Sequence, residues 1–246
     1  MELSNPASSL RPLPPIWRES RVPLEYTRLM LDPVWKGEGI PHGDGRQTLL
    51  VCGFLAGDPS MTTMARWLKR IGHRPVRAQL RWNVGCAGDI ADRLEERAER
   101  LAEESGRRIA VVGQSRGGSC ARALAVRRPD LVEQVVTLGS PLRNQFDVHP
   151  GVMVQIGLLG TLGTLGVPGL FSRSCTWGDC CTQAKEEMLA PLPHGVSLTS
   201  IYSRTDGIVR WRSCLDEDAE HVEIPASHIG MAVSAPAYRE VARALA

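Results

Sequence analysis

The sequence predicts an α/β fold: one mostly parallel sheet of about six strands, with helices on both faces and an apolar cap insertion. Short apolar runs alternate with helix-length segments along most of the chain, which is the pattern of strands joined by crossover helices. The length of 246 residues suits one domain of this kind, and no shift in composition indicates a second. We therefore expect a single domain built around a single sheet.

The alternation gives each predicted element its place. Apolar runs predict strands at residues 48–53, 75–82, 108–113, 132–141, 196–203 and 220–227. Helical spacing of apolar residues, or clear start and stop residues, predicts helices at 24–35, 60–72, 89–106, 117–130 and 236–246. Pro33 is expected to stop the first helix. Ser60 is the expected N-cap of the second, and Gly72 its stop.

Composition divides the chain into three regions. Residues 1–46 form an N-terminal arm and helix, and residues 47–246 form the sheet domain. A cap or lid insertion is expected at about 148–193, because residues 150–172 carry no charge and glycine recurs at every third position over 157–169. This glycine density predicts a poor isolated helix. A loop packed on the core and a membrane-contacting element are the alternatives for the insertion.

Charge and composition exclude some classes of function. The chain is 43% hydrophobic and 23% charged, with a formal net charge of +2, so no basic field indicates binding of nucleic acid. Lys36, Lys69 and Lys185 are the only lysines among 29 basic residues, so a single arginine indicates little by itself. The N-terminal stretch lacks a charged start followed by a long apolar run, and we predict a cytoplasmic location.

Cysteine occurs seven times, at positions 52, 86, 120, 175, 180, 181 and 214. The spacing contains neither paired Cys-x-x-Cys motifs nor a Cys/His cluster typical of zinc, so we predict no metal site and no cofactor. A disulfide from Cys180 or Cys181 to Cys214 is left open. A reducing cytosol favours free thiols instead.

A serine lies at the centre of the stretch AVVGQSRGGSC, residues 110–120. Ser115 follows a predicted buried strand and precedes a predicted helix, with Gly113 and Gly117 two positions away on either side. A sharp strand-to-helix turn strains the serine backbone and leaves no room for neighbouring side chains. The helix also points its free N–H groups at the site. We predict that Ser115 is a nucleophile.

A nucleophilic serine needs a base and an acid that orients the base. Both must follow strands, because the carboxyl ends of parallel strands share one edge of the sheet. Asp206 follows the strand at 196–203, and His228 follows the last strand. We therefore predict a catalytic triad of Ser115, Asp206 and His228, with Asp179 of the cap as the reserve acid.

The remaining histidines and acids fit a triad less well. Asp216 and Asp218 lie in a polar loop that predicts a solvated turn. The other histidines start or precede strands, or flank the cap, instead of following a core strand: His42, His73, His149, His194 and His221. None of these residues is therefore chosen as base or acid.

Two backbone N–H groups are expected to stabilise the oxyanion. One belongs to Arg116, directly after the serine, and the other to Phe54, in the loop after the first core strand. We expect Leu55, Asn83 and Met153 to bind the substrate. A plain Asn/Gly turn is the alternative for Asn83, and packing within the cap is the alternative for Met153.

Four motifs, CGFLAGD, GQSRGG, SRTDGIV and SHIGM, together resemble the oxyanion loop, nucleophile elbow, acid loop and histidine loop of the α/β-hydrolase superfamily. Within it the resemblance is to bacterial lipase- or esterase-like serine hydrolases, and it covers about residues 47–246. The first two strands of the family sheet are missing. Cys52 replaces a common histidine, and Arg116 replaces an uncharged residue or histidine. The Arg116 guanidinium either binds a carboxylate or phosphate of the substrate or pairs with a nearby acid.

The resemblance and the triad together imply a cofactor-independent serine hydrolase of carboxylic esters with a hydrophobic acyl or alcohol part. Its partners would be an ester or lipid-like substrate and, through the cap, a transient lipid interface. A thioesterase, an amidase or an acyltransferase using the same residues is the nearest alternative. A non-catalytic lipid- or partner-binding homologue, or an interfacial protein anchored by residues 151–171, is the alternative from another class.

Overall fold

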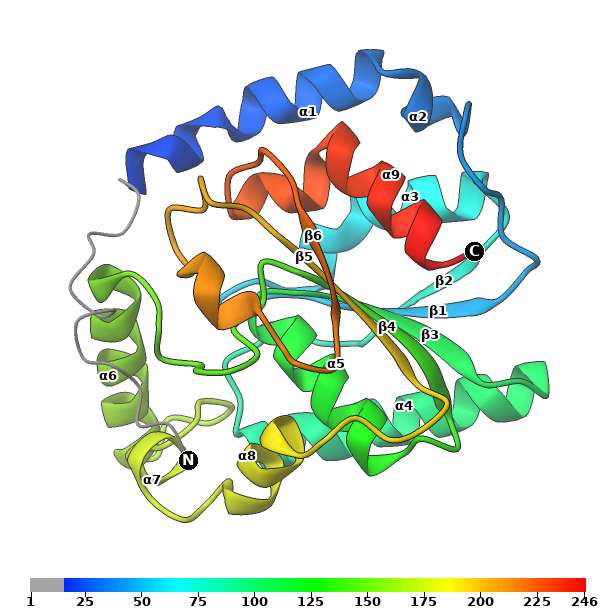
Figure 1. Cartoon of the computed structure of the whole chain (residues 1–246). Coiled ribbons are helices and arrows are strands. Elements are labelled where there is room, and N and C mark those ends of the chain that lie inside the picture. Colours follow the sequence, from blue (N-terminus) through cyan, green and yellow to red (C-terminus); the bar gives the residue numbers. More distant parts are fainter. Residues whose placement is uncertain (1–15) are drawn as a thin grey trace.

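The computed structural model describes residues 16–246, and its centre is one sheet of six strands (Figure 1). The strand order is β2-β1-β3-β4-β5-β6, and every neighbouring pair is parallel. The strands are β1 (Gln47–Val51), β2 (Arg74–Arg77), β3 (Ile109–Gln114), β4 (Val132–Leu138), β5 (Ser197–Tyr202) and β6 (Glu220–Glu223). The predicted fold class and its six strands are therefore confirmed.

Helices cover both faces of the sheet (Figure 1). On one face lie α3 (Thr62–Arg70) and α9 (Ala235–Ala244), with α1 (Val22–Leu31) and α2 (Pro33–Lys36) outside them. On the other face lie α4 (Ala87–Ser105) and α5 (Arg116–Arg127). Every residue of β1 and β3 is buried between these layers, so the carboxyl ends of the two strands are held rigidly.

The helix expected at 24–35 is two helices that meet at Pro33. α1 ends before Asp32, whose backbone is extended with a ψ of 140°. The Asp32 side chain accepts a hydrogen bond of 2.9 Å from the N–H of Val34 and so caps α2. Pro33 thus stops the first helix, as predicted, and also starts the second. α1 packs against the turn η5 (Ile229–Val233) at the site edge of the sheet.

The helix α3 begins later than predicted. The 3-10 turn η3 (Asp58–Met61) precedes it, and α3 starts at Thr62. Ser60 is therefore not the N-cap, because it lies within this turn and its hydroxyl donates to the carbonyl of Gly57 at 2.8 Å. The predicted stop is confirmed, since Gly72 follows the helix in a left-handed conformation with a φ of 93°.

The cap lies between β4 and β5. Its helices are α6 (Pro150–Thr164), α7 (Arg173–Trp177) and α8 (Thr182–Leu189). The glycine-rich stretch forms α6, although its composition predicts a poor helix. A cap and a packing contact explain the difference: His149 caps the helix by accepting the N–H of Gly151 at 3.0 Å. In addition, a Cβ on Gly163 would lie 2.1 Å from the carbonyl oxygen of Phe171, so glycine allows that segment to lie against the helix.

α6 has 15 residues and leaves several large apolar side chains in contact with solvent. Among the helices of residues 16–246, none combines the length and the hydropathy that crossing a bilayer requires.

Candidate active site

Ser115 occupies the sharp turn between β3 and α5. Its backbone has a φ of 52° and a ψ of −127°, which is a strained conformation for a residue with a side chain. The neighbouring glycines make the turn possible. A Cβ on Gly113 would lie 2.5 Å from the backbone nitrogen of Gly118, and a Cβ on Gly117 would lie 2.4 Å from the carbonyl oxygen of Val51. The two glycines predicted beside the serine are therefore required by close backbone contacts.

Asp206 and His228 form a buried pair next to this turn. The Nδ1 of His228 donates a 2.7 Å hydrogen bond to Oδ2 of Asp206. The other carboxylate oxygen accepts the N–H groups of Ile208 at 2.8 Å and Val209 at 2.7 Å, so the carboxylate is fixed at both oxygens. Gly139 leaves room for the pair, since a Cβ there would lie 3.1 Å from both Asp206 Oδ2 and His228 Nδ1. The pairing fixes the imidazole so that its Nε2 is free for other partners.

The surroundings of His228 act on its pKa in opposite directions. Burial disfavours the charged imidazolium and lowers the pKa, whereas the Asp206 carboxylate and, more weakly, that of Glu19 raise it. The net effect raises the pKa above the usual value of 6.5. A group with these properties accepts a proton readily near neutral pH.

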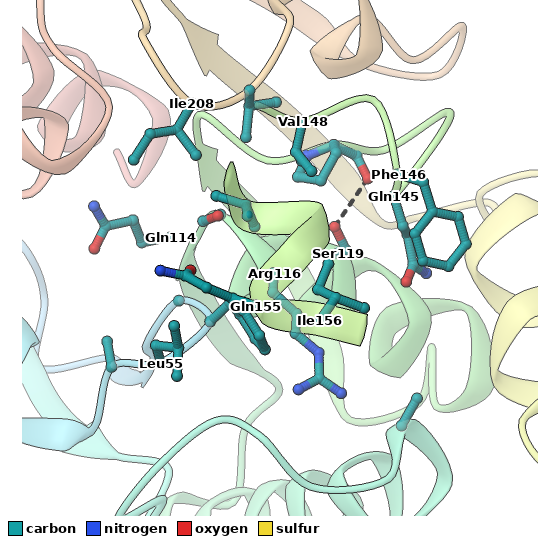
Figure 2. A pocket seen from close by; sticks show the side chains of 18 of the residues that line it. Leu55, Gln114, Arg116, Ser119, Gln145, Phe146, Val148, Gln155, Ile156 and Ile208 are labelled. Carbon is teal, nitrogen blue, oxygen red and sulfur yellow. Dashed lines mark hydrogen bonds between the residues drawn. The ribbon is translucent and has the colours of Figure 1, made fainter. Parts of the chain in front are cut away.

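Ser115 and His228 line the same cavity, which has a volume of about 420 Å³. The cavity lies at the carboxyl edge of the sheet, between the sheet domain and the cap. Figure 2 shows its wall, to which Leu55, Ile208, Val148 and Ile156 contribute apolar side chains. The structure thus brings the predicted serine, acid and histidine to one edge and places an apolar cavity beside them.

The loop after β1 packs against the serine. A Cβ on Gly53 would lie 3.2 Å from the Cβ of Ser115, so this loop touches the turn at Ser115 directly. Phe54 and Leu55 follow and line the cavity, and Leu55 turns the chain with a φ of 58°. Asn83 does not line the cavity. It is fully buried, and its Nδ2 donates to the carbonyl of Cys52 at 2.7 Å. This hydrogen bond holds the start of the loop after β1.

Arg116 lines the cavity, and within residues 16–246 its guanidinium forms no ion pair with an acid. Its two terminal nitrogens donate to the carbonyls of Asn83 at 2.9 Å and Gly85 at 2.8 Å. The group also lies 5.9 Å from the ring centre of Phe171 in the cap. Arg116 therefore links the serine turn to the loop before α4. The sequence suggested instead that it binds a substrate anion or pairs with an acid.

Other expected residues lie away from the reacting groups. From α6 the cavity receives Val152, Gln155 and Ile156, whereas Met153 is not part of its wall. Asp179, the reserve acid, is exposed in the cap, while Asp206 holds His228. Asp216, by contrast, is not solvated as expected: it is buried and lies 2.6 Å from the Nε of Arg122.

The structure adds two carboxylates that sequence reasoning missed. Glu19, from the turn η2 (Ile16–Arg21) before α1, accepts the backbone N–H groups of Gly207 at 3.0 Å, His228 at 3.0 Å and Ile229 at 2.9 Å. Glu25 is buried on α1 and accepts the N–H of Ser227 at 2.8 Å. The N-terminal segment thus holds the acid loop and the histidine loop together. Its sequence carries no motif that signals this role.

A disulfide from Cys180 or Cys181 to Cys214 does not form. All seven cysteines are free thiols, and Cys214 is buried beside Tyr202 and Val209. Both cap cysteines lie instead near Cys86, at the start of α4. The bridge to Cys214 that the sequence left open is therefore not present in the structure.

Comparisons with known proteins agree on the fold. No protein-family model and no curated protein sequence matches the chain. A metagenomic carboxyl esterase of known structure is 16% identical with a TM-score of 0.60, over 98% of this chain and 96% of the esterase. A Bacillus licheniformis lipase is 13% identical with a TM-score of 0.58, over 83% of this chain and 94% of the lipase.

A monoglyceride lipase from Saccharomyces cerevisiae is similar in the same way, at 13% identity and a TM-score of 0.57, over 83% of this chain and 87% of the lipase. A metagenomic α/β-hydrolase enzyme also aligns, at 16% identity and a TM-score of 0.52 over 82% of this chain. The chain therefore has the α/β-hydrolase fold that its four motifs predicted, and three of these comparison structures are lipases or esterases.

Proposed function

We propose that the protein is a serine hydrolase that cleaves carboxylic esters with a hydrophobic acyl or alcohol part. His228 takes the proton of Ser115 as the hydroxyl attacks the ester carbonyl, and Asp206 holds His228 in the tautomer that can accept it. The N–H groups of Phe54 and Arg116 stabilise the oxyanion. His228 then protonates the leaving alcohol, and water cleaves the acyl-enzyme by the same route.

One observation carries this proposal: a strained serine shares a cavity with a histidine that a buried carboxylate holds at 2.7 Å. Strain at a non-glycine residue persists only where the surroundings impose it. A binding protein gains nothing from a fixed acid and base beside such a serine. The arrangement therefore supports catalysis over a purely binding role.

The walls of the cavity support the proposed class of substrate. Its volume of about 420 Å³ lies within the roughly 300–1,000 Å³ of small-molecule sites, and most of its wall is apolar. Two positively charged residues, Arg116 and Lys185, also line the cavity, and the Arg116 guanidinium donates to two backbone carbonyls. The mostly apolar wall favours an ester with a hydrophobic part.

The outer face of the cap supports the expected contact with a lipid interface. Val154, Leu158 and Leu165 expose 72%, 60% and 76% of their surface, and they lie on α6 or directly after it. Exposed apolar side chains grouped on one helix favour contact with an apolar surface. Substrate presented in an emulsion would then reach the cavity beside this helix.

The test is covalent labelling with a fluorophosphonate, read by intact mass. We expect one adduct on the wild type, none on Ser115→Ala, and an unchanged adduct on Ser119→Ala. Ser119 is the matched control because it lines the same cavity, and its hydroxyl donates to the carbonyl of Pro141 at 3.0 Å (Figure 2). An adduct that survives Ser115→Ala, or folded wild type that reacts neither alone nor with detergent, would refute the proposal.

A substrate panel then separates the acyl-transfer chemistries. Matched esters, thioesters and amides of graded chain length are offered with water alone and with an added alcohol. We expect esters with medium or long chains to give the highest kcat/KM. Faster turnover of thioesters or amides, or transfer to the alcohol in preference to water, would keep Ser115 as nucleophile but replace ester hydrolysis as the reaction.

A further inference from the structure

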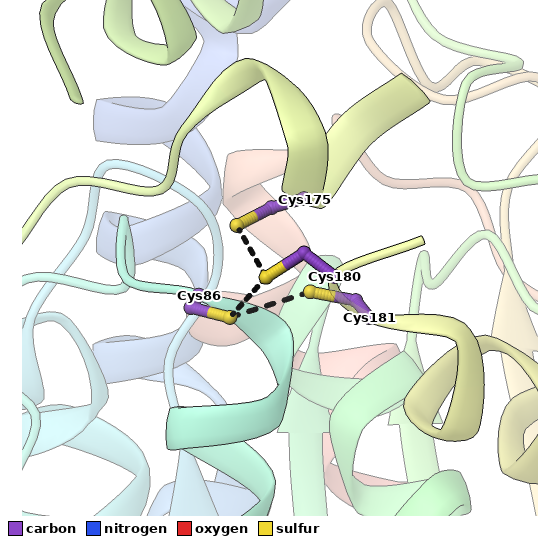
Figure 3. A group of neighbouring side chains, drawn as sticks. All are labelled: Cys86, Cys175, Cys180 and Cys181. Carbon is purple, nitrogen blue, oxygen red and sulfur yellow. Dashed lines mark hydrogen bonds between the residues drawn. The ribbon is translucent and has the colours of Figure 1, made fainter. Parts of the chain in front are cut away.

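Four of the seven cysteines gather at one point, where the cap meets the sheet domain (Figure 3). Cys86 comes from the start of α4, and Cys175, Cys180 and Cys181 come from the cap. Their four sulfur atoms all lie within 4.8 Å of one another. The sulfur of Cys86 is 3.7 Å from that of Cys180 and 3.3 Å from that of Cys181, and the sulfurs of Cys175 and Cys180 are 3.5 Å apart.

These separations suit a tetrahedral metal ion. Zn–S bonds of about 2.3 Å in tetrahedral geometry place neighbouring sulfurs about 3.8 Å apart. Sulfurs joined as a disulfide are about 2.0 Å apart, well below the observed separations. Tetrahedral S₄ coordination is typical of zinc among the common metal ions.

The surroundings favour negative charge at this point. Cys86 is the N-cap residue of α4 and Cys181 that of α8, so two helix N-termini face the cluster. Lys185, one of only three lysines in the chain, donates from Nζ to the carbonyl of Gly178 at 3.0 Å, in the loop between the cap ligands.

We propose that Cys86, Cys175, Cys180 and Cys181 bind one structural zinc ion that fastens the cap to the sheet domain. Binding replaces four S–H bonds by four Zn–S bonds and releases four protons, with no change in oxidation state. The bound site carries a net charge of −2, which Lys185 and the two helix N-termini partly balance. A cytoplasmic location, as predicted, would keep the four thiols reduced.

The site would also shape the substrate cavity. Cys175 and Cys181 line the cavity that contains Ser115, so their fixed position defines one of its walls. Cys86 follows Gly85, whose carbonyl accepts the Arg116 guanidinium at 2.8 Å. The ion would therefore hold the cap and the loop beside the serine turn in one arrangement. The zinc site itself does not depend on the proposed hydrolase activity.

The proposed zinc site departs from the sequence-based expectation of no metal site for a physical reason. Cysteine spacing identifies zinc sites whose ligands come in close pairs. Cys86, however, is separated from the other three cysteines by α4, β3, α5, β4 and α6. Only the packing of α4 against the cap brings the fourth sulfur into place. The three cysteines outside the cluster, Cys52, Cys120 and Cys214, are at least partly buried and separate from it.

The experiment measures metal in the full chain, purified under reducing conditions. We expect zinc in a ratio of one per chain, by elemental analysis, after incubation with excess zinc and gel filtration. Cys175→Ala and Cys180→Ala should each lose most of the bound zinc, and the control Cys120→Ala should retain it. Cobalt in place of zinc should give the visible spectrum of a tetrahedral thiolate site in the wild type and in the control only.

Alkylation gives a second readout that does not depend on any variant. Cys180 is the exposed member of the cluster, so it should react slowly with iodoacetamide in the zinc-bound protein and rapidly after a chelator removes the ion. Reduced wild type without zinc uptake, or equal uptake by all variants, would overturn the proposal. So would two disulfides among the four cysteines in protein purified without reductant, or iron in place of zinc.

Discussion

Replacing Glu19 by glutamine tests whether the N-terminal segment positions His228, the proposed catalytic base. Glu19 Oε1 accepts the N–H groups of Gly207 and His228, both at 3.0 Å, and Oε2 accepts the N–H of Ile229 at 2.9 Å. Glutamine has nearly the same shape but one acceptor oxygen in place of two. One N–H therefore faces the new NH₂ group, and the other two donate to a neutral oxygen.

The expected loss follows from these bonds. A hydrogen bond to a charged group contributes about 1.5–3 kcal/mol and a neutral one about 0.5–1.5 kcal/mol, so two weakened bonds and one broken bond amount to roughly 3–5 kcal/mol. Glu19 is half-buried, and relaxation of its loop recovers part of this loss. We take about 2 kcal/mol as the effect on the transition state, which corresponds to a decrease in kcat/KM of roughly 30-fold.

The pH profile separates positioning from a general loss of stability. The negative charge of Glu19 contributes to the raised pKa of His228, so the neutral side chain in Glu19→Gln should lower that pKa. His228 must be neutral to accept the serine proton, and the acidic limb of kcat/KM in the wild type should therefore lie above pH 6.5. In Glu19→Gln this limb should move to lower pH. A merely destabilised protein would show no such movement.

The assay is ester hydrolysis from pH 5 to 9 with a soluble substrate, on protein whose folding is checked by circular dichroism. Glu38→Gln is the control, because Glu38 is exposed in the same N-terminal segment and loses the same charge. It should match the wild type in both kcat/KM and pH profile. A Glu19→Gln enzyme within twofold of the wild type, with an unmoved acidic limb, would refute the positioning role.

Two further substitutions test packing around the cap. Gly163→Ala should destabilise the cap, because its Cβ would lie 2.1 Å from the Phe171 carbonyl oxygen; limited proteolysis of the cap should become faster. Gly157→Ala, with nothing within 4 Å, should instead stabilise the helix by about 0.5–1 kcal/mol. Arg122→Ala should lower the free energy of unfolding by about 3–5 kcal/mol in urea, because it leaves the buried Asp216 carboxylate without its 2.6 Å partner.

Each of these predictions has a result that contradicts it. Equal rates of proteolysis of Gly163→Ala and Gly157→Ala would show that the chain at Phe171 can move away from the new Cβ without destabilising the cap. For the buried pair, the control is Arg143→Ala, since Arg143 and Glu217 are both mostly exposed and contribute about 0–1 kcal/mol. If Arg122→Ala costs no more than Arg143→Ala, the buried pair adds nothing to stability.

The sequence predicted the sheet, and it placed Ser115, Asp206 and His228 at one edge of it, because local signals and topology act together there. A buried apolar run marks each central strand, and parallel strands bring the residues that follow them to one edge. Asp206 and His228 are therefore placed by strand ends alone, and the tight glycine contacts beside Ser115 leave a recognisable pattern. Local sequence patterns were enough to predict an element wherever contacts between sequence neighbours determine its structure.

The sequence-based predictions failed where single contacts that leave no clear pattern in the sequence decide the structure. α6 forms because His149 caps it and Phe171 packs on it, and glycine propensity reports neither contact. Glu19 lies in a segment without strand pattern, and its role depends on where α1 docks. Ser60 was predicted as an N-cap, but it lies within the turn η3 and its hydroxyl donates to the carbonyl of Gly57.

Arg116 joins the chemistry of the serine turn to the attachment of the cap. Its guanidinium donates to the carbonyls of Asn83 and Gly85, and the Asn83 side chain donates to the carbonyl of Cys52, where the oxyanion loop begins. Cys86, the next residue after Gly85, belongs to the proposed zinc site. A shift of Cys86 would therefore reach Arg116 directly and Phe54 through Asn83. Both proposed oxyanion donors depend in this way on the loop that the cap cysteines would hold, so lifting the cap would weaken oxyanion stabilisation as well as open the cavity.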